Sequence, residues 1–448
     1  MLWKHQSEAL DFVKPRRSCL LDMACGTGKS RVAIECINKT NAKSVLVICP
    51  KTVMAVWRRE LERWLCISGR VTVLDGRGSS TRKARIAKLN MPGIIVINYQ
   101  SAWRKDMAKV LLDHHWDMVI CDESHYLKCH TTHVSRFARK LKATRRLCLT
   151  GTPMPNSPLD IFGQALFLDE TLFGPSWHQF RNTYAVLKRI PTVPVPVVAK
   201  LKNLDYMNSV LALVTYKVRQ DVLDLPPVIH QEIPVALSKT AMKMYMSLER
   251  AMIADMEGGV VTVSNALVRL LRLQQITSGH VPDDESRTVF EVDTAKYEAL
   301  VDLLDQIARD QSVVVFGRFR HDLVVARRAA EATGWKYLEL SGSANDLEAD
   351  ATMQKTPHVL GVQIASGGVG VDLSRAAYAI YLSTGFSLGQ YEQSVARLHR
   401  PGQLAKHVHY YHIVAAGTVD EHVQAALEAK ANVVEIVLGS LAKKNVHI

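Results

Sequence analysis

A glycine-rich turn near the amino terminus carries the first residues that could do chemistry. The stretch LLDMACGTGKS, residues 20–30, runs from apolar residues into Gly26 and Gly28 and ends in Lys29 and Ser30. Glycines let backbone N–H groups curl around an anion, so a strand followed by such a turn is typical of a phosphate-binding loop. In that loop the lysine meets the outer phosphates and the Ser30 hydroxyl binds a magnesium ion. The full pattern has a glycine where this sequence has Met23, and a surface turn with an incidental lysine is the alternative for this stretch alone.

Two adjacent carboxylates end a second apolar run, DMVICDESH, residues 117–125. Ligands of α/β sheets bind at the carboxyl ends of strands, so Asp122 and Glu123 should face the phosphate loop. Hydrolysis of a nucleoside triphosphate needs a metal ion across the outer phosphates and a group that orients the attacking water. Asp122 suits the first role and Glu123 the second. A solvated acidic turn is the alternative for these residues taken alone.

Two later motifs could act on the same phosphates. LTGTPMPN begins at Leu149, and its threonines, Thr150 and Thr152, could report the phosphate state to neighbouring loops, although a proline-stopped turn would look the same. In QYEQSVARLHRPGQ, Arg397 and Arg400 are three residues apart, which predicts that they share one helix face. Arginines from another domain would stabilise the charge that grows in phosphoryl transfer, each contributing about a thousandfold in rate. A basic surface helix is the alternative.

The elements that must position these residues form two series. At 448 residues the chain is too long for one core. Short apolar runs alternate with helical patterns over residues 18–153 and again over 312–414, which predicts two α/β domains with mainly parallel sheets flanked by helices. The stretch from about Phe173 to His280 is interrupted by prolines and predicts a linker with helical insertions. We place the boundary near Pro226, which gives domains 1–225 and 226–448.

Charge and cysteine usage limit the class of protein. Lysine plus arginine number 56 against 43 acidic residues, a net charge of +13, which favours a polyanionic partner such as nucleic acid. No apolar segment is long enough to span a bilayer and the start lacks a signal-peptide pattern, so we expect no membrane partner. The eight cysteines contain no CxxC pair and fit a reducing compartment. These features together predict a cytoplasmic protein.

A set of segments along the chain resembles, in order, the motifs of superfamily-two helicases. The segments are KHQSEAL, MACGTGKS, VICPKTVMAVW, VINYQS, CDESH, LTGTPMPN, VVVFGRF, ASGGVGVDL and EQSVARLHRPGQ. The chain is similar, more narrowly, to Swi/Snf-type DNA translocases, on LTGTPMPN, LRLQQITSGH, YLELSGS and HRPGQ. The resemblance covers nearly the whole chain. It implies an ATP-driven motor with two RecA-like lobes, a nucleotide cleft and DNA lying across both lobes, with ATP and Mg²⁺ as cofactors.

The resemblance also implies a role for individual positions. Gln6 matches the glutamine that reads adenine, Ser30 and Asp122 match the magnesium ligands, and Glu123 matches the acid that activates water. The catalytic set is Lys29, Asp122, Glu123 and the paired arginine fingers Arg397 and Arg400. The nucleotide-binding set is Gln6, Gly26, Thr27, Gly28, Lys29, Ser30 and Asp372. The residues implied in nucleic-acid contact, or in coupling that contact to hydrolysis, are Lys51, Asn98, Tyr99, His125, Thr150, Thr152, Arg318 and Gln393. Ser124 departs from the family by standing where alanine is common.

Contacts to the phosphate backbone position a strand without reading its bases, so we expect little sequence preference and strong salt dependence. Helix amino termini are anion sites, and the Pro50-Lys51-Thr52 segment begins one such helix. The basic run over residues 77–88 is an accessory DNA contact or a solvated helix face. A zinc site built from Cys129, His130 and His133 is set aside because the spacing repeats no finger pattern and neighbouring His125 belongs to the DESH motif.

The leading hypothesis is an ATP-dependent translocase on double-stranded DNA. The first alternative is a strand-separating helicase on DNA or RNA. The second is a nucleotide-dependent DNA-binding scaffold that recruits a partner protein. The chain starts five residues before Gln6 and ends soon after the last motif, which predicts a bare motor of bacterial or phage origin, acting in a bacterial cell or phage-infected host with a possible targeting partner.

Overall fold

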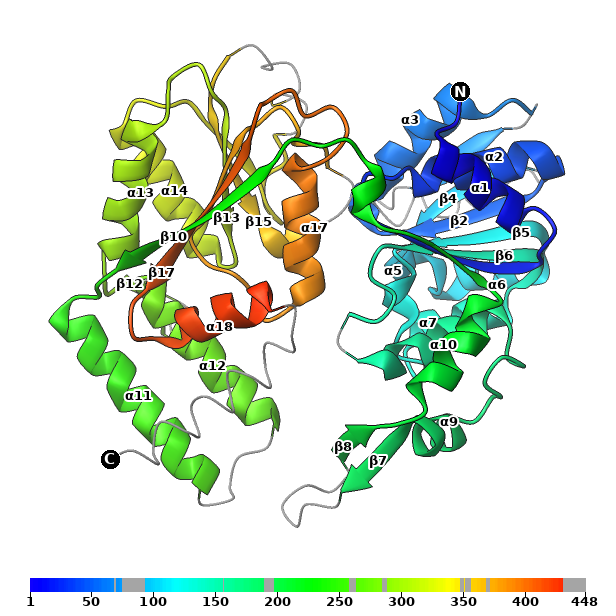
Figure 1. The fold of residues 1–448 in the computed structure, drawn as a ribbon, viewed down its shortest axis with the longest axis horizontal. Coiled ribbons are helices and arrows are strands. Elements are labelled where there is room, and N and C mark those ends of the chain that lie inside the picture. The colour runs from blue at the N-terminus through cyan, green and yellow to red at the C-terminus, as the bar shows by residue number, and fades with distance from the viewer. Residues whose placement is uncertain are drawn as a thin grey trace. The chain divides into compact units, whose positions relative to one another are not determined.

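The computed structural model describes residues 1–67, 70–74, 93–155, 157–188, 197–257, 263–283, 288–346, 350, 356–367 and 371–429. These residues form two compact units, and the chain passes from the first to the second between Asp224 and Leu225 (Figure 1). Each unit contains one large parallel sheet with helices on its faces. The predicted fold class, α/β with two mainly parallel sheets, is therefore confirmed.

The first unit is built on a seven-stranded sheet in the order β3-β4-β2-β5-β6-β1-β9, with neighbouring strands parallel throughout. The strands are β1 (Ser18–Met23), β2 (Val45–Cys49), β3 (Val71–Leu74), β4 (Ile94–Asn98), β5 (His115–Asp122), β6 (Lys142–Thr150) and β9 (Thr215–Val218). The central strands VLVIC and IIVIN are buried along their whole length, as expected of parallel strands covered on both faces. The sequence-predicted strands of this unit are all present.

The helices of the first unit surround this sheet. The main ones are α1 (Lys4–Val13), α2 (Lys29–Thr40), α3 (Met54–Trp64), α5 (Tyr99–Ala102), α6 (Lys105–Asp113), α7 (His133–Lys140), α8 (Ile161–Leu168), α9 (Trp177–Tyr184) and α10 (Leu204–Ala212). Short 3₁₀ turns stand at η1 (Lys51–Val53), η2 (Ser124–Leu127), η3 (Pro158–Asp160) and η4 (Gln220–Val222). A small antiparallel hairpin, β7 (Ala185–Lys188) and β8 (Val197–Leu201), follows α9. Trp57 and Trp116 are fully buried and anchor the packing of α3 and β5.

The second unit is built on a six-stranded parallel sheet in the order β10-β17-β16-β13-β15-β14. The strands are β10 (Val228–Val235), β13 (Val313–Gly317), β14 (Tyr337–Leu340), β15 (Val359–Gln363), β16 (Tyr378–Tyr381) and β17 (Val408–Ala415). The helices are α11 (Lys239–Glu257), α12 (Val263–Thr277), α13 (Ala295–Gln306), α14 (Arg320–Ala332), α16 (Ile364–Gly367), α17 (Leu388–Leu398) and α18 (Val419–Glu428). A two-stranded antiparallel ribbon joins β11 (His280–Pro282) and β12 (Val289–Glu291).

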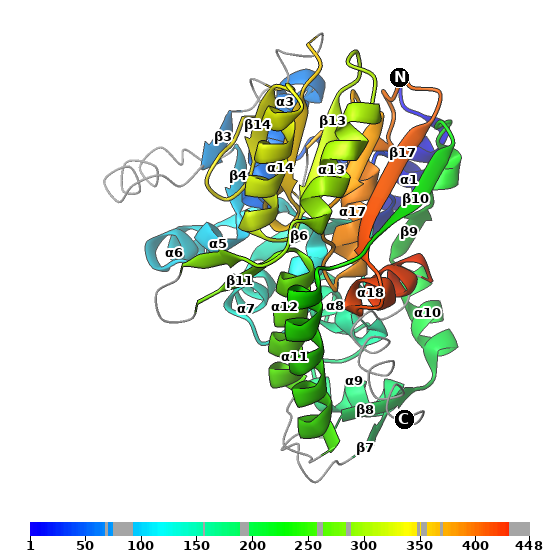
Figure 2. The same ribbon diagram turned by 90° about the vertical axis from the view of Figure 1, so that its left-hand side faces the viewer.

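The stretch between the two series does more than link them. It contains the long helix α11, one of the predicted helical insertions, which packs beside α12 (Figure 2). It also supplies β9 to the edge of the first sheet and β10 to the edge of the second. Within the described residues, no helix is long and apolar enough to cross a membrane.

Candidate functional site

The phosphate loop connects the end of β1 to the start of α2. Gly26 and Gly28 have φ angles of 82° and 86°, in the left-handed region that glycine adopts at little cost. A Cβ atom on Gly28 would lie 2.2 Å from the side-chain nitrogen of Gln6, so this position has no room for a side chain. Gly28 is the residue before the first turn of α2, whose free N–H groups form an anion site.

Two side chains of the loop are folded onto its own backbone. Lys29 donates from Nζ to the carbonyls of Met23 at 2.8 Å and Ala24 at 3.3 Å. Thr27 is fully buried and its hydroxyl donates to the carbonyl of Ala24 at 2.7 Å. Ser30 lies in the first turn of α2, one residue beyond Lys29. Lys29 and Ser30 therefore lie at the same end of the loop, and the Thr27 hydroxyl stabilises the loop backbone.

Two residues of helix α1 contact the backbone of the phosphate loop. The buried Gln6 donates from Nε2 to the carbonyl of Thr27 at 3.1 Å and accepts the backbone N–H of Trp3 at 3.0 Å. The Nε2 atom of His5 lies 2.9 Å from the same Thr27 carbonyl. The structure thus brings Gln6 to the loop, and its contact with adenine stays a prediction. It adds His5, the residue before Gln6 in the KHQ motif, to the contacts of the loop.

Asp122 and Glu123 stand at the carboxyl end of β5. Asp122 is 5 % exposed; its Oδ2 accepts from the indole Nε1 of Trp57 at 2.8 Å and its Oδ1 accepts from the backbone N–H of Glu123 at 3.0 Å. Burial, together with the charge of Glu123, raises the pKa of Asp122 to about 6, and the Trp57 donor and Lys29 oppose that rise. Glu123 has a φ of 50°, a costly conformation for a residue with a side chain that recurs at functional sites.

The LTGTP motif lies between the phosphate loop and the DESH motif, because β6 runs between β1 and β5 in the sheet. A Cβ atom on Gly151 would lie 3.0 Å from the carbonyl of Met23, so the chain after β6 packs directly on the phosphate loop. On its other side, the Thr150 hydroxyl lies 3.3 Å from Nδ1 of His125. That same nitrogen lies 3.3 Å from a carboxylate oxygen of Glu123.

These contacts bring three separate motifs to one edge of the first sheet. Thr150 also accepts the backbone N–H of Thr152 at 3.1 Å, and the Thr152 hydroxyl is buried without a hydrogen-bond partner among the described residues. A buried orphan hydroxyl next to a phosphate loop fits a group that receives its partner from a ligand. The structure therefore places Thr150 beside the DESH motif, and the role of the two threonines in reporting the phosphate state stays a prediction.

A buried hydrogen-bond chain also links the DESH and LTGTP motifs. Ser124 donates from Oγ to the Oε1 of Gln164 at 2.7 Å, and Gln164 donates from Nε2 to the carbonyl of Pro153 at 2.6 Å. Gln164 is fully buried in α8. Sequence reasoning missed Gln164, although a polar residue inside the apolar helix IFGQALFL signals a buried partner.

Asn98 and Tyr99, implied in nucleic-acid contact or in its coupling to hydrolysis, are both buried, at 5 % and 1 % exposed. Their side chains therefore do not lie on the surface, and their role in contact or coupling stays a prediction. Asn98 caps α5 by accepting the N–H of Ser101 at 2.9 Å, and Tyr99 donates from its hydroxyl to the backbone carbonyl of Asp122 at 2.8 Å. Lys51 is exposed and lies in the 3₁₀ turn η1. The sequence predicted that a helix begins at this segment, whereas α3 begins after η1, at Met54.

Arg397 and Arg400 do not share a helix face, which corrects the prediction made from their spacing. Helix α17 ends at Leu398, so Arg397 lies in its last turn and Arg400 lies beyond it. Pro401 explains the ending, because the residue before a proline is disfavoured in the helical conformation. The two guanidinium groups still converge, since both donate to the carbonyl of Val371, at 3.4 and 3.3 Å. Arg400 also lies 3.7 Å from Asp372, which is exposed and accepts the N–H of Ser374.

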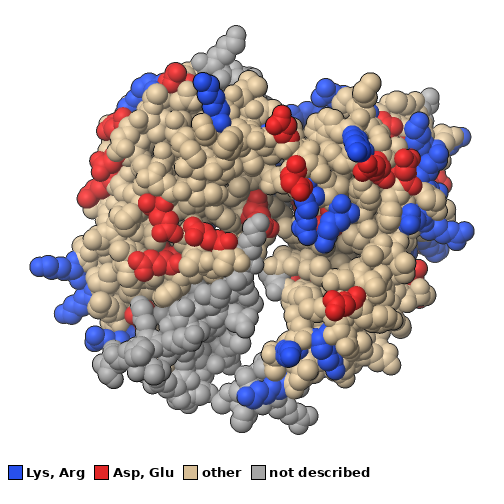
Figure 3. All heavy atoms as spheres, viewed as in Figure 1, with Lys and Arg blue, Asp and Glu red and all other residues tan. Residues whose placement is uncertain are grey.

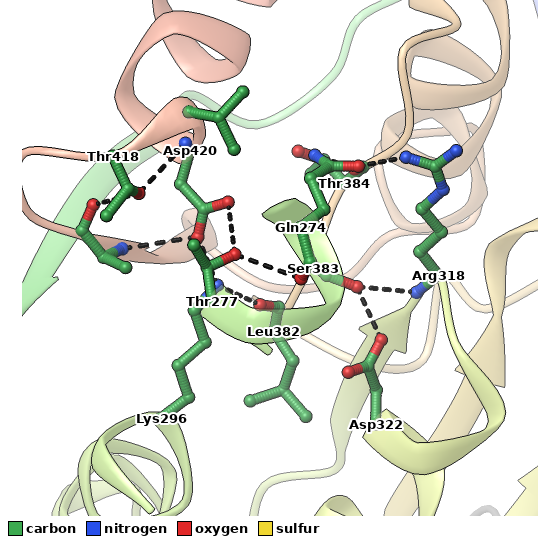
Figure 4. Close-up of polar contacts among 12 residues, drawn as sticks. Gln274, Thr277, Lys296, Arg318, Asp322, Leu382, Ser383, Thr384, Thr418 and Asp420 are labelled. Carbon is green, nitrogen blue, oxygen red and sulfur yellow. Dashed lines mark hydrogen bonds and ion pairs between the residues drawn. The ribbon is translucent and has the colours of Figure 1, made fainter. Parts of the chain in front are cut away.

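The remaining sequence-predicted residues of the second unit are largely enclosed. Gln393 is 6 % exposed in α17. Arg318, directly after β13, is half-buried; its guanidinium donates to Gln274 of α12 and its backbone N–H donates to the Ser383 hydroxyl at 2.8 Å (Figure 4). Burial lowers the pKa of Arg318 to about 10. Ser383 in turn donates to the buried Asp322 at 2.5 Å.

A buried ion pair continues this network in Figure 4. Lys296 of α13 donates from Nζ to Asp420 at 2.6 Å and to the carbonyl of Leu382 at 2.8 Å. The Thr277 hydroxyl donates to the other carboxylate oxygen of Asp420 at 2.8 Å. Gln274, one turn earlier in α12, donates to the carbonyl of Thr384 at 3.1 Å. The ends of α12, α13, β16 and α18 are therefore tied together in one polar cluster.

The donor chemistry decides which metal the first unit could hold. The Ser30 hydroxyl and the Asp122 carboxylate supply hard oxygen atoms, the ligands that magnesium prefers alongside substrate phosphates. Elsewhere in the described part of the chain no group of three metal-binding side chains gathers. His130 instead packs on Trp177 with ring centroids 5.0 Å apart, and His133 stacks on Trp103 at 4.9 Å.

Figure 3 shows one face of the molecule, on which basic and acidic side chains are interspersed. The positive excess of the chain is therefore not collected into a single stripe among the described residues visible there. The basic run over residues 77–88, predicted as a DNA contact or a solvated helix, lies outside the described residues.

Comparison with known proteins identifies the family of the chain. A family model described as SNF2-related domain matches residues 6–280, and one described as helicase conserved C-terminal domain matches residues 295–402. The human "DNA annealing helicase and endonuclease ZRANB3" is 24% identical over 458 residues, which cover 98% of this chain and 40% of that protein. "Putative protein p41" of Acyrthosiphon pisum secondary endosymbiont phage 1 is 26% identical over 449 residues, which cover 94% of both chains.

The solved structure titled "Sulfolobus solfataricus SWI2/SNF2 ATPase core in complex with dsDNA" is also similar, with 21% identity, a TM-score of 0.45 and coverage of 96% of this chain and 91% of that one. The chain spans about two fifths of the length of the human relative and nearly all of the phage relative.

Proposed function

We propose, from the premise that this chain belongs to the SNF2-related domain family, that it hydrolyses ATP to drive movement along double-stranded DNA. The observation that carries the proposal is the junction of three motifs at one sheet edge in the first unit. There the phosphate loop, the Asp122–Glu123 pair and the Thr150–Thr152 segment contact one another. In this proposal residues 1–225 form the nucleotide-binding lobe and residues 226–448 the second motor lobe.

Each residue of the junction receives a role that its geometry supports. Lys29 would leave the carbonyls of Met23 and Ala24 for the outer phosphates, which are stronger acceptors for its charge. Ser30 and Asp122 would hold Mg²⁺, which neutralises phosphate charge when bound. Glu123 would orient the attacking water, and His125 would sense that carboxylate, which is supported by one nitrogen lying 3.3 Å from both Glu123 and Thr150. Gln6 would contact the nucleotide base.

Arg397 and Arg400 would act on the charge that grows at the transferred phosphoryl group. Their convergence on the Val371 carbonyl supports a shared task despite their separate backbone positions. If they act mainly in the closed state of the cycle, Arg397→Ala or Arg400→Ala should lower kcat by about a thousandfold while changing nucleotide affinity much less. An equal loss in kcat and affinity would contradict this role. Arg309→Ala, at an exposed arginine of the same unit, is the control.

DNA is the proposed partner because the chain carries a net charge of +13 and its human relative is named a DNA annealing helicase. We propose duplex DNA without strong sequence preference, contacted through its phosphates, with Lys51 as an exposed candidate. The phage relative, matched over 94% of its length, supports action inside a bacterial cell or a phage-infected host.

The decisive experiment measures steady-state ATP hydrolysis with no nucleic acid, duplex DNA, single-stranded DNA or RNA, using Lys29→Ala as the blank. Stimulation by duplex DNA that falls steeply with added salt supports the translocase. Stimulation only by single strands or RNA would replace it with a strand-separating helicase. Hydrolysis under none of these conditions would favour the nucleotide-dependent scaffold.

A further inference from the structure

Trp57 contacts Asp122 of the proposed hydrolytic site, although its helix, α3, contains none of the residues assigned to that site. It lies in α3, is fully buried, and donates from its indole Nε1 to the Oδ2 of Asp122 at 2.8 Å. The donor and acceptor are 65 positions apart in the sequence. A buried indole N–H needs an acceptor, and here it has taken the carboxylate that ends the central strand β5.

The contact defines how the Asp122 carboxylate is turned. The indole holds Oδ2, the backbone N–H of Glu123 holds Oδ1 at 3.0 Å, and the Tyr99 hydroxyl holds the backbone carbonyl of Asp122 at 2.8 Å. Each carboxylate oxygen has lone pairs beyond the one that its donor uses. The side chain is therefore locked in one rotation while it keeps acceptor capacity for a cation.

The chemical nature of the donor matters as much as its position. An indole N–H is neutral, so it orients the carboxylate without cancelling its charge. A lysine or arginine in the same place would compete with a metal ion for that charge. Partners that orient a ligating carboxylate typically contribute tenfold to a hundredfold in metal affinity.

We propose that Trp57 is a positioning residue that presents the Asp122 carboxylate to the metal–nucleotide complex, an inference that rests on the proposed function. The same bond ties Asp122 to α3, the helix that follows the exposed Lys51 turn. Trp57 thereby joins the element proposed to meet DNA to the residue proposed to meet the metal.

The chain offers a matched control in Trp116. It is also fully buried in the first unit, and its indole Nε1 donates to a backbone carbonyl, that of Leu111, at 3.0 Å. Trp116→Phe therefore removes the same volume and the same kind of donor as Trp57→Phe, away from Asp122. A role in packing alone would make the two variants behave alike.

The test measures binding of a non-hydrolysable ATP analogue by titration calorimetry, with excess Mg²⁺ and with EDTA. For Trp57→Phe we expect affinity in Mg²⁺ to fall about tenfold, with affinity in EDTA changed by less than about twofold. Trp116→Phe should change the ratio of the two affinities little. An equal loss with and without Mg²⁺, or the same ratio in both variants, would overturn the proposal.

A shape-preserving variant covers the case in which Trp57→Phe fails to fold. Benzothienylalanine at position 57 replaces the indole N–H with sulfur and keeps the bicyclic ring, so its folded state can be checked by circular dichroism before titration. The expected and overturning results are the same as for phenylalanine. If the unaltered chain binds the analogue equally well with Mg²⁺ and with EDTA, the proposed function fails and takes this inference with it. A normal Mg²⁺ effect that both variants retain overturns the inference alone.

Discussion

Two buried aspartates, one in each unit, show how differently the same side chain can be housed. Asp122 ends β5 and meets two neutral donors, Trp57 and a backbone N–H, with a second carboxylate beside it. Asp420 lies in the first turn of α18, just after β17, and meets the Lys296 ammonium at 2.6 Å and the Thr277 hydroxyl. The Asp420 charge is paired directly with a cation, whereas the Asp122 charge is oriented by neutral donors and is offset only by the field of Lys29. An uncompensated buried charge indicates a ligand site, and a compensated one indicates structure.

The largest effect should come from breaking the compensated pair. Lys296→Met removes the cation and leaves Asp420 buried with its charge unmatched, since the two side chains are only 6% and 10% exposed. We expect the free energy of unfolding to fall by about 3–5 kcal/mol. Urea denaturation followed by circular dichroism measures this. Lys406→Met, at an exposed lysine of the same unit, is the control, and an equal loss in both variants would refute the role of the pair.

Replacing each aspartate with asparagine should have smaller effects on the free energy of unfolding, and the two effects should have opposite signs. In metal-free protein at pH 7, Asp122→Asn removes a charge that burial and Glu123 disfavour, so unfolding should cost about 1–2 kcal/mol more. The gain is limited because the amide cannot accept from both donors that the carboxylate serves. Asp420→Asn should instead destabilise, because it strips Lys296 of its counter-charge. Thermal unfolding with EDTA tests both, and two changes of the same sign would break the comparison.

The pH dependence of stability isolates the Asp122 contribution. The pKa of this carboxyl is raised from 3.8 to about 6 in the folded protein. Between these values the folded state holds a proton that the unfolded state has lost, so the stabilising contribution is complete below about pH 4 and is lost as the pH rises through 6. The difference in unfolding free energy between Asp122→Asn and the unaltered chain should therefore grow over this window. A flat difference would mean that the Asp122 carboxyl is not desolvated.

The strands that carry Asp122 and precede Asp420 could be predicted from the sequence, because an apolar run and the residues that end it lie next to each other in the chain. Continuous apolar runs such as VLVIC end at glycine, proline or acidic residues, and the order of such runs indicates two parallel sheets. The strands β3, β9 and β14, each of four residues, lie at sheet edges, and they form because the sheet beside them supplies partners. The spacing of Arg397 and Arg400 predicts one helix face, but Pro401 disfavours helix at the residue before it and α17 ends before Arg400.

The compensation of each charge could not be predicted, because the partners are distant in the chain. Lys296 and Asp420 are 124 positions apart, and Trp57 and Asp122 are 65 apart. Each of these residues alone is typical of an amphipathic helix or a strand end. Only the folded arrangement shows which aspartate has received a cation and which has received a neutral donor.

The smallest effect sharpens the comparison by removing burial while keeping the chemistry of an ion pair. Arg58 and Glu62 lie one turn apart on α3 at 3.6 Å, with side chains 60% and 63% exposed. Water screens this pair and holding two long side chains costs entropy, so Glu62→Gln should change the free energy of unfolding by less than about 0.5 kcal/mol. Urea denaturation at low and high salt would measure it beside Lys296→Met. A loss from Glu62→Gln that approached the loss from Lys296→Met would show that charge pairing alone, and not burial, sets the cost, and the contrast between Asp420 and Asp122 would then lose its physical basis.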